Sequence, residues 1–352
     1  MRSTLRAALL LLAAAGLGAC SPGYVVRAAW EEAKILNRRQ PIARIVADPA
    51  TEWETRDKLL LVLQARQFAM DSLGLAAGNS YTLYSPVDSD TLVMVLSAAY
   101  PDRMEPFTWW FPIVGRVPYK GFFDVREAER ARRRLAAQGY DTYLRPSAAF
   151  STLGWFNDPL LSTLLRYDRV PLAATVIHEI FHNTFWAPGE VAFNESLANF
   201  VGARGAVEFF CRRDGAEAES CRSAAAAWED DLRFGAFLEG LVEELEALYA
   251  RGDLSAEETL ERRAEVFADA QRRFELQVQP GLQVNGYASF SRDPLNNATL
   301  IARRIYYRRL ALFEEVYRQR GGDFRAALDA IVAAARERRD DPYAGVEALL
   351  AR

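Results

Sequence analysis

The chain has 352 residues, of which half are hydrophobic and 26% are charged, a composition typical of a globular protein with a core of ordinary size. Its formal charge of −4 argues against a nucleic-acid-binding protein. Beyond the first twenty residues, no stretch reaches about 18 uninterrupted apolar residues, so the rest of the chain is expected to be soluble.

Residues 1–19 are typical of a secretory signal peptide. Arg2 and Arg6 precede an apolar run, Ala7 to Leu17, that is too short to span a bilayer comfortably. The run ends in "LGAC", which resembles a bacterial lipobox and predicts cleavage before Cys20 with lipid on its sulfur. The alternative is an ordinary signal with an incidental cysteine. Because Ser21 follows Cys20, the resemblance to Gram-negative lipoproteins implies an outer-membrane anchor facing the periplasm.

Helices and then a small sheet are expected in the first part of the mature chain. Apolar residues recur at helical spacing from Tyr24 to Leu75, and Pro41 and Pro49 divide this region. From Tyr81 to Phe123, β-branched and aromatic residues are broken by proline and glycine, which predicts strands and connecting loops.

A capping box at Asp124 and Glu127 predicts a helix that ends near Gln138, followed by strands over 140–145 and 148–156. After residue 157, helices are expected at 170–186, 190–212, before Gly252, after a Ser255–Glu258 cap, and from near Pro294 and Asp323. The predicted fold class is therefore α+β, with a helical body and a small early sheet in one domain over residues 20–352.

Two cysteines remain beside Cys20. Cys211 and Cys221 flank the polar stretch "RRDGAEAES" between two expected helices. In a compartment that permits disulfides, this even pair favours a disulfide that pins the turn, with two free thiols as the alternative.

The only histidines, His178 and His182, lie four residues apart in the helix expected over 170–186, with Glu179 between them. Positions four apart project from one helix face, so both imidazoles can reach one ion, and imidazole nitrogen suits Zn²⁺. Glu179 is rotated by about 100° from His178, where it can act as a general base beside the ion. Burying these groups among apolar neighbours without a partner would be costly, which favours a bound metal.

Glu195 is the expected third ligand. Since no histidine is left, a carboxylate is the default. Pro188 and Gly189 allow the chain to reverse, with His182 about one turn before this break and Glu195 six residues after Gly189. The two positions then reach a similar height on antiparallel helices. Glu190 is the competitor, but it lies at the turn itself.

Two motifs of this region together resemble those of a known class of zinc peptidases. "HEIFH" followed by "FNESLANF" resembles the gluzincins, zinc peptidases in which a glutamate on a second helix is the third ligand, and "NESLA" is similar to their aminopeptidase branch. Twelve residues separate His182 from Glu195, fewer than in the best-known members. The chain also resembles a family of bacterial lipoproteins described as aminopeptidases, through the segments "RRQPIARIVADP", "PYKGFFD", "STLGWFNDPLLSTLL" and "DPLNNATLIARRIYY". The resemblance implies a zincin-like helix pair, bound Zn²⁺ and peptide substrates.

Peptide hydrolysis also requires a donor to the developing oxyanion, which in similar peptidases is a tyrosine or a histidine. Tyr306 occupies the position that the resemblance favours, with Tyr307 as the alternative and Tyr287 as a further candidate. The alternative for Tyr306 and Tyr307 is packing in a helix interface or at the surface.

Three further features bear on substrate binding. The strand expected over 148–156 either adds substrate to a sheet edge or belongs to the core. Asn199, one turn after Glu195, either hydrogen-bonds a metal ligand or is a helix-surface amide. Asp158 and Glu190 are nearby carboxylates of the kind that receives a free amine. Aminopeptidase and endopeptidase both stay open, and a non-catalytic envelope lipoprotein that binds metal or peptide is the alternative to an enzyme.

Overall fold

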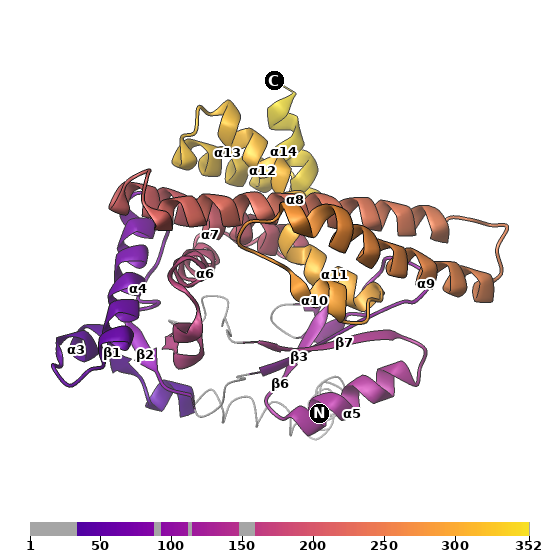
Figure 1. Cartoon of the computed structure of the whole chain (residues 1–352), viewed down its shortest axis with the longest axis horizontal. Helices are drawn as coiled ribbons and strands as arrows, with labels where there is room; N and C mark the ends of the chain where they lie inside the picture. Colours follow the sequence, from indigo (N-terminus) through magenta and orange to yellow (C-terminus); the bar gives the residue numbers. More distant parts are fainter. Residues whose placement is uncertain (1–33, 88–92, 112–114, 148–158, 352) are drawn as a thin grey trace, which may run out of the picture.

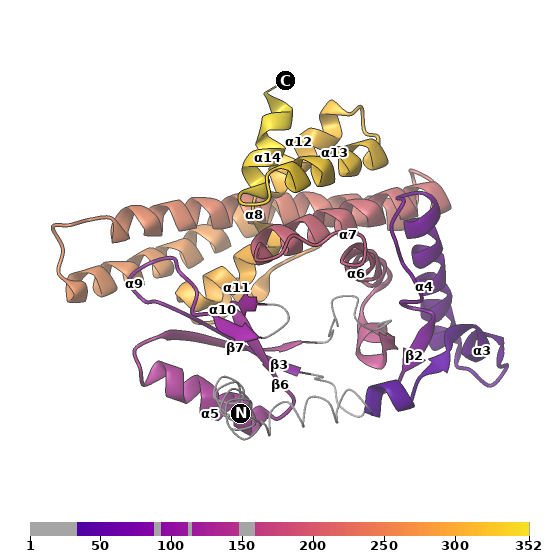
Figure 2. The same ribbon diagram turned by 180° about the vertical axis from the view of Figure 1, so that it is seen from behind.

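The computed structural model describes residues 34–87, 93–111, 115–147 and 159–351. These residues form a predominantly helical body with small sheets, so the fold is α+β, as predicted. Figures 1 and 2 show the longest helix lying across the molecule and the main sheet on the opposite side of it from the C-terminal helices. The expected signal peptide, the strand over 148–156 and Asp158 lie outside the described residues.

The main sheet is antiparallel and has the strand order β6–β3–β7. Its strands are β3 (Val93–Ala99), β6 (Tyr119–Phe122) and β7 (Asp141–Ser147). The central strand pairs on both sides, with Leu96 opposite Lys120 of β6 and opposite Leu144 of β7. Leu96 is fully buried and belongs to the apolar cluster on one face of the sheet. The strands expected between Tyr81 and Phe123 and over 140–145 are therefore confirmed in β3, β6 and β7.

The other strands are shorter than the sequence suggests. Among the described residues they form two separate small sheets, made of β1 (Gln40–Pro41), β2 (Leu83–Ser85) and β8 (Leu160–Leu161), and of β4 (Trp109–Phe111) and β5 (Gly115–Val117). The early strands that the sequence predicts are therefore divided, within the described residues, into three small sheets. Prolines are the reason, because Pro86 and Pro118 directly follow β2 and β5 and lack the N–H that a ladder needs.

Helix α5 (Val125–Ala136) covers the main sheet, as Figure 1 shows. The Asp124 carboxylate caps it by accepting the backbone N–H groups of Arg126 at 2.8 Å and Glu127 at 3.0 Å. Ala128 and Leu135 of α5 join Leu96 in the same apolar cluster. The helix ends two residues before its predicted end at Gln138.

The remaining described chain is almost entirely helical. Short helical segments occur over 34–37, 162–166, 274–278 and 279–281. The α-helices are α3 (Ile42–Ala47), α4 (Trp53–Asp71), α6 (Arg169–Phe181), α7 (Val191–Asp214), α8 (Glu219–Tyr249), α9 (Ala256–Arg273), α10 (Ala288–Arg292), α11 (Asn297–Tyr307), α12 (Leu310–Gln319), α13 (Phe324–Glu337) and α14 (Pro342–Leu350).

The helix predicted over 170–186 is shorter than expected, because α6 ends at Phe181. Beyond it the backbone tightens, with Asn183 bonded to the carbonyl of Ile180 and Thr184 to that of Phe181. Asn and Thr have low helix propensity, and the tighter three-residue bonds end the helix before the Pro188 break. His182 consequently stands at the helix end rather than in its interior.

Helices α7 and α8 form the centre of the body. A disulfide joins Cys211, near the end of α7, to Cys221, in the first turn of α8. On the buried side of α7, the Phe200 ring stacks on Phe324 at 5.8 Å and meets the edge of Trp228 at 5.7 Å. Each such aromatic side chain stabilises the fold by about 1.5–3 kcal/mol relative to exposure.

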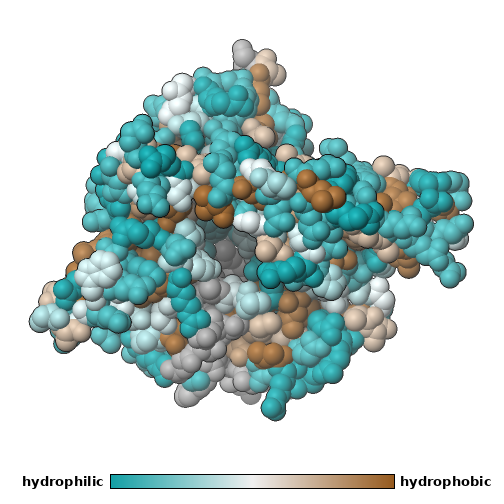
Figure 3. All heavy atoms as spheres, in the orientation of Figure 1, coloured by the Kyte–Doolittle hydropathy of each residue, from teal (hydrophilic) through white to brown (hydrophobic). Residues whose placement is uncertain are grey.

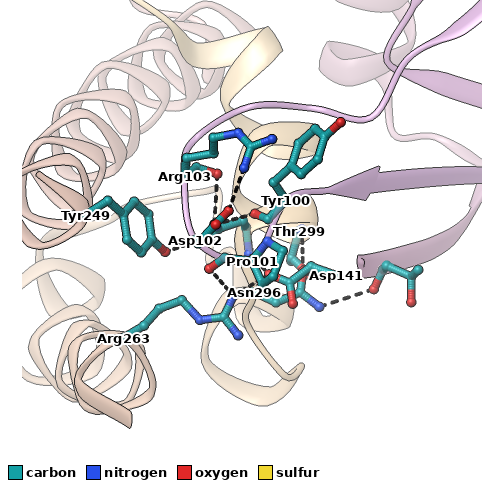
Figure 4. Close-up of polar contacts among 11 residues, drawn as sticks. Tyr100, Pro101, Asp102, Arg103, Asp141, Tyr249, Arg263, Asn296 and Thr299 are labelled. Carbon is teal, nitrogen blue, oxygen red and sulfur yellow. Dashed lines mark hydrogen bonds and ion pairs between the residues drawn. The ribbon is translucent and has the colours of Figure 1, made fainter. Parts of the chain in front are cut away.

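The start of α11 is anchored to the main sheet and to α9, as Figure 4 shows. Asn296 caps the helix, accepting the Thr299 N–H at 2.9 Å and donating to the carbonyl of Thr142 in β7 at 3.2 Å. The Asp141 carboxylate accepts Arg263 of α9 at 2.6 Å and also the backbone N–H of Asn297 at 2.9 Å.

Asn297, which is fully buried, completes this anchor. Its side-chain amide donates to the carbonyl of Tyr100 at 2.8 Å, while its amide oxygen accepts the Tyr249 hydroxyl at 2.8 Å. A polar side chain buried this way is favourable only when its bonds are made, so α11 has one well-defined position against the sheet.

No helix in the described part of the chain has both the length and the apolar character that a membrane span requires.

Candidate metal centre

Three side chains from α6 and α7 converge on one point. The Nε2 atoms of His178 and His182 lie 3.3 Å apart. The Glu195 carboxylate oxygen Oε2 lies 3.5 Å from His178 Nε2 and 3.8 Å from His182 Nε2. His182 and Glu195 are each only 7% exposed. Among the histidine, cysteine and acidic side chains of the described residues, these three are spaced closely enough to share a metal ion.

These distances fit one small ion. Ligand atoms about 2.1 Å from a tetrahedral metal lie about 3.4 Å from each other. The three measured separations, 3.3, 3.5 and 3.8 Å, surround this value. Two imidazole nitrogens and one carboxylate oxygen are also ligand types that divalent transition metals accept. The donor set therefore fits a metal ion held by three protein ligands.

The close approach of α6 and α7 depends on Gly202 of α7. A Cβ at this position would lie 2.6 Å from the backbone oxygen of Ala174 and 2.9 Å from the Cβ of His178. Gly202 follows Glu195 by seven residues, about two turns, so it lies on the same face of α7. The absence of a side chain there lets His178 and Glu195 come within bonding reach of one ion.

The connection between the two helices is fixed by Asn194. Its side-chain oxygen accepts the N–H of Ala187 at 2.8 Å, and its amide donates to the Ala187 carbonyl at 2.7 Å. Gly189 takes a positive φ of 86° in the turn between them. Because Asn194 is only 1% exposed and precedes Glu195, this pair of bonds fixes the start of α7 against the connection that follows His182.

The electrostatics of the group centre on Glu195. Burial alone would raise the pKa of this carboxyl, but hydrogen bonding and charge interaction with His178 and His182 hold it well below its usual range. Glu195 is thus ionised and faces both imidazoles, as a ligand to a cation must be.

A cavity of about 940 Å³ opens beside the group. His178 and Glu179 line it together with Tyr306. The surface is hollowed near the centre of the face shown in Figure 3, below α8. Burial raises the pKa of Tyr306 and of Tyr167, and the nearby charge of Glu179 adds a smaller contribution to both shifts.

Tyr306 lies beside the metal ligands. Its ring centroid is 6.3 Å from that of His178, and its hydroxyl accepts a long hydrogen bond of 3.4 Å from Arg145 of β7. Burial, with a further contribution from the charge of Glu195, raises the pKa of Tyr306 to about 12. The phenol therefore stays protonated at neutral pH and can donate a hydrogen bond into the cavity.

The other sequence candidates fall elsewhere. Tyr307 packs edge-on against Phe234 at 5.1 Å, away from the histidines. Asn199 is neither a partner of a metal ligand nor a surface amide, because it donates to the backbone carbonyl of Tyr306 at 3.0 Å. Glu190 lies at the start of α7, outside the metal-ligand group, and its electrostatic neighbours are Arg308 and Asp341.

Sequence reasoning overlooked three residues of this region. Tyr119 of β6 and Arg145 of β7 both interact electrostatically with Tyr306. Tyr119 stands in "PYKGFFD", a segment that carried the resemblance, so a signal for it existed. Asp231 of α8 lines the same cavity. It is 36 residues beyond Glu195, in a long helix whose pattern gives no hint of a site.

Fold and site together define a class: an α+β protein with a buried group of two histidines and one glutamate that can hold a metal ion beside a large cavity. Comparison with known families is more specific. The model of the family described as "Putative aminopeptidase" matches residues 23–341, and the chain belongs to this family. No curated protein matches the chain. No solved structure matches it either.

Proposed function

We propose that this protein is a zinc-dependent peptidase that removes residues from the N-terminus of peptides. The observation that carries the proposal is the spacing of the ligand atoms of His178, His182 and Glu195, at 3.3 to 3.8 Å. Among metals that accept imidazole, zinc is favoured because sites with two histidines and one glutamate are typical of catalytic zinc. Membership of the aminopeptidase-named family supports peptide substrates.

In this mechanism His178, His182 and Glu195 hold the metal. When bound, Zn²⁺ supplies a Lewis acid that polarises a carbonyl and activates water near neutral pH. Glu179 takes a proton from the attacking water and gives it to the nitrogen of the leaving amine as the peptide bond breaks. Tyr306 donates a hydrogen bond to the carbonyl oxygen as negative charge develops on it.

The substitution Glu179→Gln tests the mechanism. This variant keeps the three metal ligands, so bound zinc, measured by elemental analysis, should stay near one ion per chain. Turnover of a peptide library should fall by at least about 100-fold because the general base is lost. Unchanged hydrolysis in Glu179→Gln would reject the role of Glu179.

A peptide library with free and acetylated N-termini separates the kinds of activity. Cleavage of free peptides alone indicates an aminopeptidase, and cleavage of both indicates an endopeptidase. Bound metal without any cleavage would favour a non-catalytic envelope lipoprotein that binds metal or peptide.

We also propose that the mature chain is anchored by lipid on Cys20 in the outer membrane, facing the periplasm. A disulfide between Cys211 and Cys221 supports an oxidising compartment of this kind. Substituting Cys20→Ser should abolish incorporation of labelled palmitate and move the protein from the membrane to the soluble fraction. Retention of both label and membrane association in Cys20→Ser would exclude this anchor.

A further inference from the structure

Asp231 is an acidic side chain in the cavity wall, apart from the metal ligands. It lies in α8, and protein surrounds it closely although part of its surface remains accessible. One carboxylate oxygen, Oδ1, accepts both described hydrogen bonds, a very short one from the Tyr287 hydroxyl and one of 3.2 Å from the Asn285 amide. For the other oxygen, Oδ2, no hydrogen bond is found within the described part of the chain.

The neighbouring Asp230 differs from Asp231, because its hydrogen bonds give it a structural role. It is fully buried, and its oxygens accept the backbone N–H groups of Gln283, Val284 and Asn285 at 2.7 to 3.0 Å. These bonds fix the loop that carries Asn285. Asp231 has no comparable set of backbone donors, and no arginine or lysine of the described segments forms an ion pair with it.

A carboxylate enclosed by protein without a cation is unfavourable in the free protein. Burial, together with the negative charge of Asp230, raises the pKa of Asp231 to about 7 despite the bonds from Tyr287 and Asn285. A cationic ligand in the cavity would supply the missing counter-charge.

Two adjacent tyrosines lie between the surroundings of Asp231 and those of the metal ligands. Tyr306 faces His178, whereas Tyr307, the next residue, interacts with Tyr287 and with the charge of Asp231. His178, Tyr306, Tyr307 and Asp231 all line the same cavity.

We propose that the Asp231 carboxylate, held through Oδ1 by Tyr287 and Asn285, binds the protonated N-terminal amine of the peptide substrate. The inference rests on the proposed peptidase function and adds the residue that selects a free N-terminus. Because Asp231 and His178 line one cavity, a peptide whose amine binds Asp231 can extend along that cavity towards the metal ligands. The expected products are therefore a short N-terminal fragment and a shortened peptide.

Binding and hydrolysis are measured separately, so that the two proposals can fail independently. The full-length protein in detergent, loaded with zinc and carrying Glu179→Gln to prevent turnover, is titrated calorimetrically with tetra-alanine that has a free or an acetylated N-terminus. The free peptide should bind at least about tenfold more tightly. Adding Asp231→Asn, which keeps the shape of the side chain, should weaken the free peptide about 10- to 100-fold and leave the acetylated peptide unchanged.

Glu219→Gln is the matched control. Glu219 lines the same cavity but is exposed, so losing its charge should change affinity by less than about threefold. Equal affinity for free and acetylated peptides, or a preference for the free peptide that survives Asp231→Asn, overturns the assignment. So does tight binding of an acetylated peptide containing one lysine, since the bound cation would then be a side chain.

Should Asp231→Asn not fold, the pH dependence of the protein with native Asp231 decides. Asp231 is charged above about pH 7, and an α-amine is protonated below about pH 8. The affinity for the free peptide, divided by that for the acetylated peptide, should thus be highest between about pH 7 and pH 8. It should decrease both below and above this range. The other titratable groups around Asp231 are Asp230, Tyr287 and Tyr307, and the pKa values of both tyrosines lie far above this window. A ratio that does not change with pH overturns the assignment.

Discussion

Substituting Gly202→Ala perturbs the metal site without touching a ligand. The added methyl would lie 2.6 Å from the Ala174 carbonyl oxygen and 2.9 Å from His178 Cβ, whereas ordinary contact begins at 3.4 Å. The first obstacle is backbone, so α6 and α7 must separate by up to about 0.8 Å. Metal sites tolerate ligand displacements of only about 0.2 Å. Movement of this size should therefore pull His178 away from Glu195.

Two quantities should change together in Gly202→Ala. Overpacking of this kind destabilises by about 1–3 kcal/mol, even though alanine favours the helix itself by up to about 1 kcal/mol. We expect a loss of stability in that range by urea denaturation of the metal-free protein. We also expect zinc affinity, measured by competition with a coloured chelator, to fall by at least about tenfold, a decrease of about 1.4 kcal/mol.

Gly240→Ala in α8 is the matched control, because the same chemical change at this position should increase the stability of the protein. Gly240 is exposed, and nothing lies within 4 Å of the added Cβ. This variant should gain up to about 1 kcal/mol of stability with zinc affinity unchanged. If Gly202→Ala behaved like Gly240→Ala in both measurements, the close approach of α6 and α7 would not be what assembles the site.

Other substitutions test the parts of the structure that support the site. Asn194→Ala leaves the backbone N–H and carbonyl of Ala187 without their partner, so stability should fall by about 2–3 kcal/mol in urea denaturation; a loss below about 0.5 kcal/mol would contradict the role given to Asn194. Tyr306→Phe should lower kcat by about 100-fold with zinc content and KM nearly unchanged, and the reasoning fails if KM rises instead. Reducing the Cys211–Cys221 disulfide, which closes a loop with a sequence separation of 10, should cost about 3 kcal/mol of stability, and an unchanged urea midpoint in reductant would refute this.

Local patterns predicted most of the fold. The predicted caps at Asp124 and Ser255 are in the structure, because a capping side chain acts on backbone within three residues of itself, and the helix expected from near Asp323 begins there. The end of α6 was missed, since the tight bonds of Asn183 and Thr184 depend on how the chain turns towards α7. The division into several small sheets was missed as well, because strand partners are chosen by tertiary contacts that periodicity does not encode.

The sequence predicted the site residues that are close to one another along the chain. It did not predict those that are far apart in sequence. His178 and His182 are close because helical spacing places them so, and Glu195 follows from one reversal of the chain. Asp231 and Arg145 have no such relation to the histidines. Asp231 reaches the cavity and Arg145 reaches the Tyr306 hydroxyl only because α8 and β7 pack around α11, which no short pattern in the sequence expresses.

Helix α11 explains why residues far from the metal ligands belong to the site. Its first turn is bonded to the sheet through Asn296, while near its other end the carbonyl of Tyr306 accepts the amide of Asn199 from α7. The two anchors are ten residues, or about 15 Å, apart along a rigid helix. The orientation of Tyr306 towards His178, and of Tyr307 away from it, is thus set jointly by the sheet and by the helix that carries Glu195. It follows that the sheet contributes to this site by fixing α11, so that weakening the Asn296 anchor should disturb Tyr306 before it disturbs the metal ligands.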